Sequence, residues 1–258
     1  MDDFREPIDE VSLCLSGGGA RGPFHIGVLA YLEDKNIAIK AISGTSIGAL
    51  IGSSYASGVK PAEIFEIISS KSFKKMIRFN FSFKSLFKLA LDYNLVEKLL
   101  KVKTFEELPL PNYVTYFALD DGKITYAKEG EVLKSILRSI AIAPAFETIE
   151  DEETKVLYGD GGVVNNLPVE PLLEYPYPIV SVGLHPNPVF KKRGLIAVLK
   201  RVVFLAWHRN ITEAIEKSDI YITSERLTGY SLISFKNQEE LYQLGYASAK
   251  EAFEAYYS

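Results

Sequence analysis

Hydrophobic positions in the first sixty residues fall into short apolar runs that alternate with segments of helical spacing. Residues 11–16, VSLCLS, form a run that stops at glycines, as a buried strand of a parallel sheet does. In residues 23–36 apolar side chains recur every three or four positions, which predicts a helix. Residues 37–43 repeat the strand pattern, and residues 46–58 repeat the helical one up to Gly58. This order predicts a parallel sheet with helices on its faces.

The rest of the chain continues the alternation and adds one hairpin. Residues 113–121 and 122–130 alternate polar and apolar positions around Asp121-Gly122, which is typical of a β-hairpin. The same reading predicts helices and strands in turn over residues 61–71 (helix), 131–143 (helix), 155–162 (strand), 177–186 (strand), 195–219 (helix), 220–225 (strand) and 237–257 (helix). The chain shows no internal repeat and no low-complexity linker, so we expect one domain over residues 1–258.

Composition narrows the class of protein. Charged residues make up 24% of the chain and its net charge is -4, which gives no reason to expect a nucleic-acid partner. Cys14 is the one cysteine, which rules out an internal disulfide and a cysteine-based metal cluster. The acidic N-terminus has no signal-peptide pattern, and no apolar run reaches the roughly 18 residues of a membrane span. We expect a cytoplasmic protein, with peripheral attachment to a membrane left open.

The most specific chemical motif lies at the second strand-to-helix turn. Residues 44–48, GTSIG, match G-x-S-x-G between a predicted strand and a predicted helix, the context that makes the serine a nucleophile. Gly44 and Gly48 leave room for a sharp bend, and the helix behind Ser46 brings partial positive charge to a developing oxyanion. A turn of small residues that only packs a helix on a strand would match the same motif. The predicted strand and helix on either side favour the catalytic interpretation.

A nucleophilic serine needs a base, and the three histidines are weak candidates. His25 lies near the start of the first helix. His185 and His208 come late enough for a Ser-acid-His order, but neither stands in a distinctive glycine turn. Each suits an ordinary satisfied or partly exposed histidine better than a catalytic one.

Asp160 is the stronger candidate base. It follows a short predicted strand and precedes Gly161 and Gly162, a pattern that a simple turn also explains. A carboxylate that follows a strand of an α/β sheet lies near the edge where active sites form. Asp160 acts as the base directly if it lies within hydrogen-bonding distance of Ser46.

The glycine loop after the first strand has two interpretations. Residues 16–22, SGGGARG, contain the spacing G-x-G-x-x-G of dinucleotide-binding loops. That use requires an acidic residue at the end of the second strand, which instead ends in Ser43-Gly44, and no G-K-[ST] follows the glycines. The alternative is an oxyanion hole, in which the loop's N–H groups face the site and Arg21 adds charge or locks the loop in place.

Together, GGGARG, GTSIG and DGG in this order resemble the patatin-like phospholipase family, over about residues 11–185. The resemblance implies a three-layer α/β/α sandwich with a mainly parallel central sheet, which the C-terminal helices and a strand complete. It implies a Ser-Asp dyad without histidine, with Ser46 as nucleophile and Asp160 as general base. It also implies hydrolysis of acyl esters in phospholipids, lysophospholipids or neutral lipids, with no metal and no other cofactor.

The resemblance carries further residues into the site. We expect Gly18 and Gly19 to be the main amide donors of the oxyanion hole. The other implied residues are Gly17, Arg21 and Gly22 in that loop, Gly44 and Gly48 beside the nucleophile, and Gly161 and Gly162 after the base. One departure stands in SIAIAPAF, where Ile140 takes a position at which the family commonly has serine.

Residues 71–91 form a local cationic and aromatic segment with no acid, inside the less regular residues 71–104. The segment is a candidate lid or membrane-facing insertion, because each cation near an anionic surface adds about 1 kcal/mol. An ordinary helical insertion with solvated lysines explains it equally well. A second basic stretch, residues 191–201, would add to it only if both shared a face.

The sequence therefore predicts a serine lipid acyl hydrolase of phospholipase A or lysophospholipase type, acting on phospholipid or lysophospholipid. Two alternatives stay open: a nucleotide-binding protein that uses Gly17–Gly22, and a catalytically silent scaffold of the same fold. The intact serine and aspartate argue against the second of these.

Overall fold

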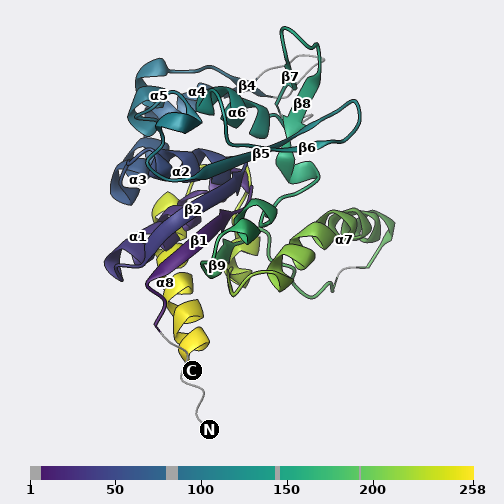
Figure 1. The fold of residues 1–258 in the computed structure, drawn as a ribbon. Coiled ribbons are helices and arrows are strands. Elements are labelled where there is room, and N and C mark those ends of the chain that lie inside the picture. Colours follow the sequence, from purple (N-terminus) through teal and green to yellow (C-terminus); the bar gives the residue numbers. More distant parts are fainter. Residues whose placement is uncertain (1–6, 80–86, 143–145, 192) are drawn as a thin grey trace.

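A computed structural model describes residues 7–79, 87–142, 146–191 and 193–258 of the chain. In this described part, eight strands form one sheet in the order β10-β9-β1-β2-β5-β8-β7, and β6 pairs with β5 (Figure 1). The neighbours in the run from β10 to β5 pair in parallel, whereas β6, β7 and β8 are antiparallel. The strands are β1 (Glu10–Leu15), β2 (Ala38–Thr45), β5 (Asn112–Ala118), β6 (Ile124–Ala127), β7 (Ile149–Glu150), β8 (Leu157–Asp160), β9 (Ile179–Val182) and β10 (Ile220–Ile222).

Helices cover both faces of the sheet, as expected for an α/β/α sandwich. Alternate side chains of β1 divide between two cores: Leu13 and Leu15 pack in the larger one with α1 and α8, whereas Cys14 faces the smaller one with α7. β1 is buried on both faces, which explains its unbroken apolar run. The main helices are α1 (Pro23–Asp34), α2 (Ile47–Ala56), α3 (Pro61–Ser69), α6 (Val132–Ser139), α7 (Leu195–Glu216) and α8 (Gln238–Tyr257).

The predicted insertion, residues 71–104, contains two short helices and a two-stranded ribbon. They are α4 (Lys71–Met76), β3 (Ile77–Phe79), β4 (Phe87–Leu89) and α5 (Tyr93–Leu99), with β3 and β4 antiparallel. Phe73 and Met76 of α4 are buried in the larger core. Residues 80–86 lie outside the described residues, so the membrane contact expected of residues 71–91 stays a prediction. No helix within the described residues is long and apolar enough to cross a membrane.

Each helix and strand predicted above forms in the predicted order, although several are shorter than predicted, and β7 is an additional short strand. The helix predicted to run up to Pro144 ends at Ser139. Two residues later, the Ala141 carbonyl accepts the Asp160 N–H at 3.1 Å, so the chain leaves the helix to pair with the end of β8. The predicted hairpin forms as β5 and β6, with Gly122 at a φ of 73° in its turn.

Paired glycines let α1 and α8 cross closely. A Cβ on Gly27 of α1 would lie 2.0 Å from the Tyr242 carbonyl oxygen, and a Cβ on Gly245 of α8 would lie 2.0 Å from the Phe24 carbonyl oxygen. Since both obstructing atoms are backbone, no side-chain rotation relieves the clash. This contact fixes the C-terminal helix on the helix that follows the glycine loop.

Gly27→Ala is therefore expected to lower the free energy of unfolding by about 1–3 kcal/mol, because the helices must separate to admit one methyl group. Urea unfolding followed by circular dichroism measures the change. Gly229→Ala is the matched control, since a Cβ there meets nothing within 4 Å. Equal unfolding midpoints for the two variants would contradict this account of the helix crossing.

Candidate active site

Ser46 occupies the turn between β2 and α2 in a strained backbone conformation. Its φ is 55° and its ψ is -122°, a region that non-glycine residues rarely adopt. Crowding at the turn explains the flanking glycines: a Cβ on Gly48 would lie 2.3 Å from the Leu15 carbonyl oxygen, and one on Gly44 would lie 2.7 Å from Gly48. The sharp bend expected of GTSIG is therefore present.

A serine that sequence reasoning missed supports this turn. The Ser46 N–H donates to Ser139 Oγ at 2.8 Å, and the Ser139 hydroxyl donates to the Thr115 carbonyl at 2.6 Å. Ser139 is fully buried, so the bridge is protected from water. Ile140 is the position at which the resemblance leads one to expect a serine, whereas the hydroxyl at the site comes from the preceding residue. Its signal was a lone serine in the last helical turn before Ala141.

Strand register brings Asp160 to Ser46. Thr45 of β2 pairs with Thr115 of β5, and Tyr116 of β5 pairs with Asp160 of β8, so the two side chains lie at one level across a single strand. From the sequence, Asp160 is expected to follow a strand and to lie near the sheet edge where active sites form. β8 in fact runs antiparallel to β5, so the aspartate reaches the site from the opposite direction.

The Asp160 carboxylate is buried, with 2% of the residue exposed, and polar hydrogens face it. Burial raises its pKa to about 6, because removal from water disfavours the charged form. The Gly162 N–H, at 2.7 Å from Oδ1, and a hydrogen bond from the Ser46 hydroxyl oppose this rise. The carboxylate is thus ionised at pH 7 and stays basic enough to accept a proton.

The glycine loop lies against Ser46. A Cβ on Gly17 would lie 3.1 Å from the Ser46 Cβ. The Gly17 N–H donates to the Asn166 carbonyl at 3.3 Å, and the Gly22 N–H donates to the Gly19 carbonyl at 3.1 Å. Among the described residues, the Gly18 and Gly19 N–H groups have no acceptor within the chain. These are the two amides that the sequence analysis favoured as oxyanion donors.

Arg21 holds the loop in place. Its Nη1 donates to the Leu184 carbonyl at 2.6 Å, and its Nε and Nη2 donate to the Tyr230 carbonyl at 3.1 and 2.8 Å. Burial lowers the pKa of the guanidinium. From the sequence, Arg21 is expected either to add charge to the site or to lock the loop in place. These contacts fit the second role, because they tie the loop to the end of β9 and to residue 230.

The histidines bond to backbone carbonyls instead of to the candidate pair. His25 Nε2 lies 2.8 Å from the Ser16 carbonyl, His208 Nε2 lies 3.1 Å from the His185 carbonyl, and His185 bonds to the Gly17 backbone. Burial lowers the pKa of His25 to about 4 and that of His185 to about 3. In the described part of the chain no histidine hydrogen-bonds to Ser46 or Asp160.

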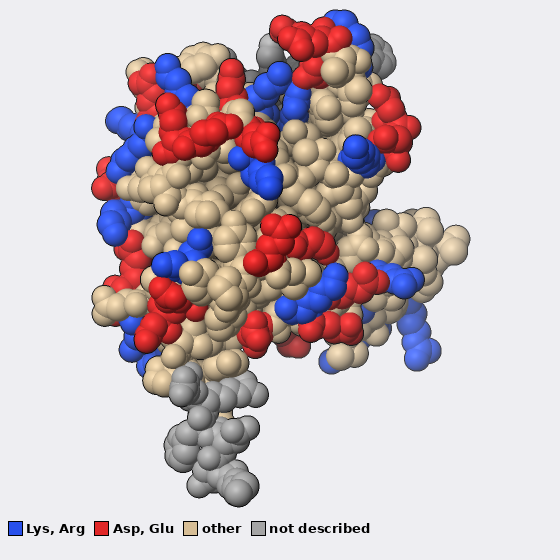
Figure 2. Space-filling view, viewed as in Figure 1, with Lys and Arg blue, Asp and Glu red and all other residues tan. Residues whose placement is uncertain are grey.

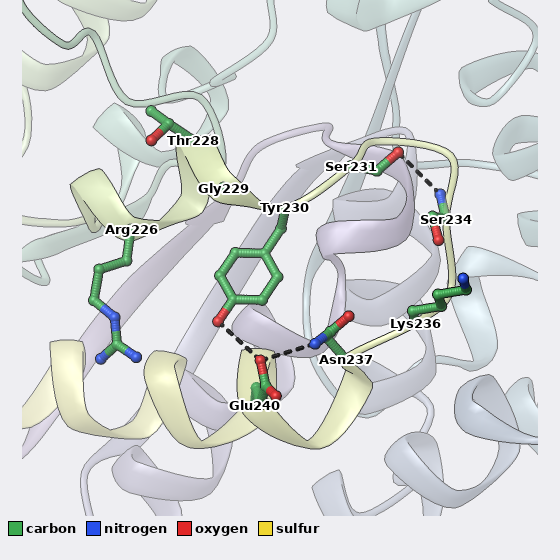
Figure 3. Close-up of a pocket in the computed structure, with 9 residues that line it drawn as sticks. All are labelled: Arg226, Thr228, Gly229, Tyr230, Ser231, Ser234, Lys236, Asn237 and Glu240. Atoms are coloured by element: carbon green, nitrogen blue, oxygen red, sulfur yellow. Dashed lines mark hydrogen bonds between the residues drawn. The ribbon is translucent and has the colours of Figure 1, made fainter.

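Two further observations define the surroundings. A Cβ on Gly161 would lie 2.5 Å from the Thr115 carbonyl oxygen, so the turn after Asp160 presses on β5. Over the described residues, no group of three acidic, histidine or cysteine side chains is arranged to hold a metal ion. A polar pocket of about 600 Å³ opens elsewhere, between residues 226–231 and the start of α8, where Tyr230 and Asn237 both bond to Glu240 (Figure 3). Its lining contains neither Ser46 nor Asp160.

The helix-covered sheet and the serine at its strand-to-helix turn define an α/β protein with a candidate catalytic serine, and comparison with known proteins gives the family. The model of the patatin-like phospholipase family matches residues 13–173. The chain belongs to the patatin-like phospholipase family.

Curated relatives carry the same domain inside much longer chains. Patatin-like phospholipase domain-containing protein 6 of Mus musculus is 28% identical over 62% of this chain and 12% of its own length. Lysophospholipase nte1 of Aspergillus fumigatus is 25% identical over 95% of this chain and 18% of its own length. The chain thus spans less than a fifth of each of these relatives.

Solved structures share the fold. VipD from Legionella pneumophila matches with a TM-score of 0.55 at 13% identity, over 96% of this chain and 67% of that one. The type III effector protein ExoU also matches with a TM-score of 0.55 at 13% identity, over 98% of this chain and 54% of that one. The expected α/β fold, a central sheet with helices on both faces, is confirmed.

Asp160→Asn is expected to stabilise the protein at pH 8. The folded pKa of about 6 lies above the reference value of 3.8, so above pH 6 the native state holds a buried carboxylate that the unfolded chain would solvate. A rise of two pKa units corresponds to about 3 kcal/mol at most, which a neutral amide avoids. The gain should shrink as the pH falls through 6 and vanish below about 4, where Asp160 itself is protonated in both states.

Thermal unfolding of both proteins between pH 4 and 8 measures the effect. Asp151→Asn serves as a control of opposite sign, because hydrogen bonds from the Thr154 N–H and other groups lower the pKa of that carboxyl. It should lose stability at pH 8. A gain from Asp160→Asn that did not depend on pH would contradict the assignment of the raised pKa.

Proposed function

We propose that the chain is a serine lipid acyl hydrolase of phospholipase A or lysophospholipase type, with Ser46 as nucleophile and Asp160 as general base. The observation that carries this proposal is the combination of the strained Ser46 turn and the buried Asp160 carboxylate. The Ser46 hydroxyl hydrogen-bonds to this carboxylate, whose pKa is about 6. Strained residues and perturbed acids concentrate at functional sites. The names of the relatives, phospholipase and lysophospholipase, support a lipid ester as the substrate.

In the proposed reaction Asp160 takes the Ser46 hydroxyl proton while Oγ attacks the ester carbonyl carbon. The tetrahedral intermediate collapses, and Asp160 returns the proton to the departing alkoxide oxygen, which leaves an acyl group on Ser46. Asp160 then takes a proton from water, whose oxygen attacks the acyl carbonyl and releases the fatty acid. Ser46 recovers its proton from Asp160, so the site returns to its starting state.

The oxyanion of each intermediate needs donors, and the Gly18 and Gly19 N–H groups are the candidates. The N-terminus of α2 starts directly behind Ser46 and adds partial positive charge. Loss of one such donor typically lowers the rate by about 10²–10³-fold. A phosphate of a nucleotide could use the same amides, but β2 ends in Ser43, Gly44 and Thr45 with no acid for a ribose.

Ser46→Ala is expected to abolish release of fatty acid from a panel of phospholipids and lysophospholipids, because no other nucleophile is proposed. Mass spectrometry of the lipids measures the products, and a fluorophosphonate probe should label the wild type at Ser46 only. Ser234→Ala, at the rim of the polar pocket, is the control and should keep full activity. Absence of both hydrolysis and labelling would favour the non-catalytic scaffold, and tight binding of a nucleotide would favour the other alternative.

The rate should depend on pH through Asp160. As the base, Asp160 must be ionised, so kcat/KM should fall tenfold per pH unit below an apparent pKa of about 6. Stopped assays between pH 4.5 and 8 measure this limb, and circular dichroism at each pH checks that the protein stays folded. A rate that stays constant down to pH 4.5 would argue against Asp160 as the base.

A further inference from the structure

The N-terminal half of α7 projects from the body of the protein. We call residues 195–206 the projecting half of α7. The buried residues of this helix are His208, Ile211 and Ala214, all beyond that half. Figure 1 shows α7 extending away from the sheet at the right of the view. The projecting half is therefore exposed on most of its circumference.

Its side chains are apolar even though water surrounds them. Leu195 is 85% exposed, Leu199 61% and Val202 56%, and with Val198 they follow the i, i+3, i+4, i+7 spacing of one helix face. Ile196 and Val203, on the flank, are also largely exposed. Single exposed hydrophobic residues are common on protein surfaces, whereas a continuous apolar stripe of this kind marks an interaction site.

The same face becomes polar where the helix joins the body. Continuing the helical spacing from Val202 leads to Arg209 and Glu213, which form an exposed ion pair at 3.2 Å. The apolar stripe is therefore confined to the part of α7 that extends outward. A helix of which only the outer end is buried by another surface needs apolar side chains at that end alone, and α7 has this distribution.

Positive charge accompanies the stripe. Residues 175–212 contain no aspartate or glutamate, in a chain whose net charge is -4. Lys191, Arg193 and Lys200 are exposed, and the Arg201 guanidinium lies over the Phe190 and Phe204 rings. In Figure 2 the projecting lobe at the right is mostly tan, with blue residues along its lower margin and both blue and red residues where it joins the body.

The root of the projecting half touches the candidate active site. The Trp207 indole N–H donates to the Gly162 carbonyl, in the turn after Asp160, and the Asn210 amide donates to the Val164 carbonyl. A second exposed apolar segment adjoins the glycine loop: the Leu232 carbonyl accepts the Ala20 N–H at 2.8 Å, and Ile233 is 69% exposed. The helix that carries the apolar stripe thus contacts the turn after the candidate base, and the second apolar segment contacts the proposed oxyanion loop.

We propose that the projecting half of α7 docks on the surface of an anionic phospholipid bilayer. Its apolar face enters the boundary between headgroups and acyl chains, while the flanking cations contact the headgroup phosphates. The proposal rests on the proposed function in one respect: docking on a bilayer is taken to present Ser46 to lipid esters. It places the contact on α7, a segment distinct from residues 71–91.

The charges favour a bilayer over a second copy of the chain. In a two-fold dimer the same patch meets itself, so Lys200 and its neighbours would face like charges. In addition, the apolar side chains surround more of the helix than one packing seam can cover, whereas lipid can cover them all. Anionic headgroups complement the cations and acyl chains complement the stripe.

Vesicle sedimentation tests the proposal, with every protein carrying Ser46→Ala so that the lipid stays intact. Vesicles of phosphatidylcholine with one quarter phosphatidylglycerol should bind the protein, and pure phosphatidylcholine should bind it more weakly. Leu199→Ser with Val202→Ser should weaken the partition coefficient at least about tenfold on both vesicles. Lys191→Gln and Lys200→Gln should each weaken it about fivefold on the anionic vesicles alone, an effect that added salt removes.

Leu173→Ser is the matched control, because Leu173 is 53% exposed on another segment and its loss should leave vesicle binding unchanged. With Ser46 restored, the Leu199/Val202 variant should hydrolyse a dissolved short-chain ester as fast as the wild type. Vesicle binding that survives the double substitution would overturn the proposal. So would a wild-type dimer, seen by sedimentation velocity, that the double substitution dissociates without any vesicle binding in either form.

Failure of the proposed function has a different signature. In that case the wild type would not hydrolyse the dissolved ester, while vesicle binding by the Ser46→Ala proteins would still depend on α7.

Discussion

Everything proposed for this site depends on the backbone of Ser46 being held at a positive φ, a conformation that serine rarely adopts unless surrounding contacts enforce it. Its positive φ costs free energy that the surrounding contacts must supply. Ser139 accepts the Ser46 N–H and is anchored on Thr115, and Gly48 lets α2 press against the end of β1. Ser46 is thus fixed by three separate segments, so its Cα–Cβ bond keeps one direction relative to the sheet.

The electrostatics of the pair follow from the same packing. Burying Asp160 raises its pKa, and the Gly162 N–H and the Ser46 hydroxyl limit that rise. A carboxylate left in water would be too weak a base, and one buried without donors would hold its proton at neutral pH. In the proposed reaction this intermediate environment lets the aspartate act as the base without histidine, at a cost in stability that a neutral amide would avoid.

The layout of α7 connects the site to the surface. Its inner half packs on the small core and bonds to the turn after Asp160, so it is part of the site's wall. Its outer half carries exposed apolar side chains and cations. One rigid helix therefore spans from the candidate base to the outside, and any surface that binds the outer half is held at a fixed position relative to Ser46.

Local sequence patterns were enough to identify the individual strands, helices and turns. Apolar runs and helical spacing predicted β1, α1, β2 and α2, because strand and helix periods depend on neighbouring residues only. The strand–turn–helix context of GTSIG and the glycines of SGGGARG identified the candidate nucleophile and amide donors for the same reason.

Which of these elements contact one another is visible only in the folded structure. The antiparallel direction of β8, the pairing of Asp160 with Tyr116 and the contact of Ser139 with Ser46 join segments about 40 to 95 positions apart, which no local period encodes. The contacts that Arg21 makes and the exposure of α7 likewise depend on how distant segments of the chain pack against one another. Sequence patterns report how each segment folds, whereas register and docking follow from the free energy of the whole packed chain.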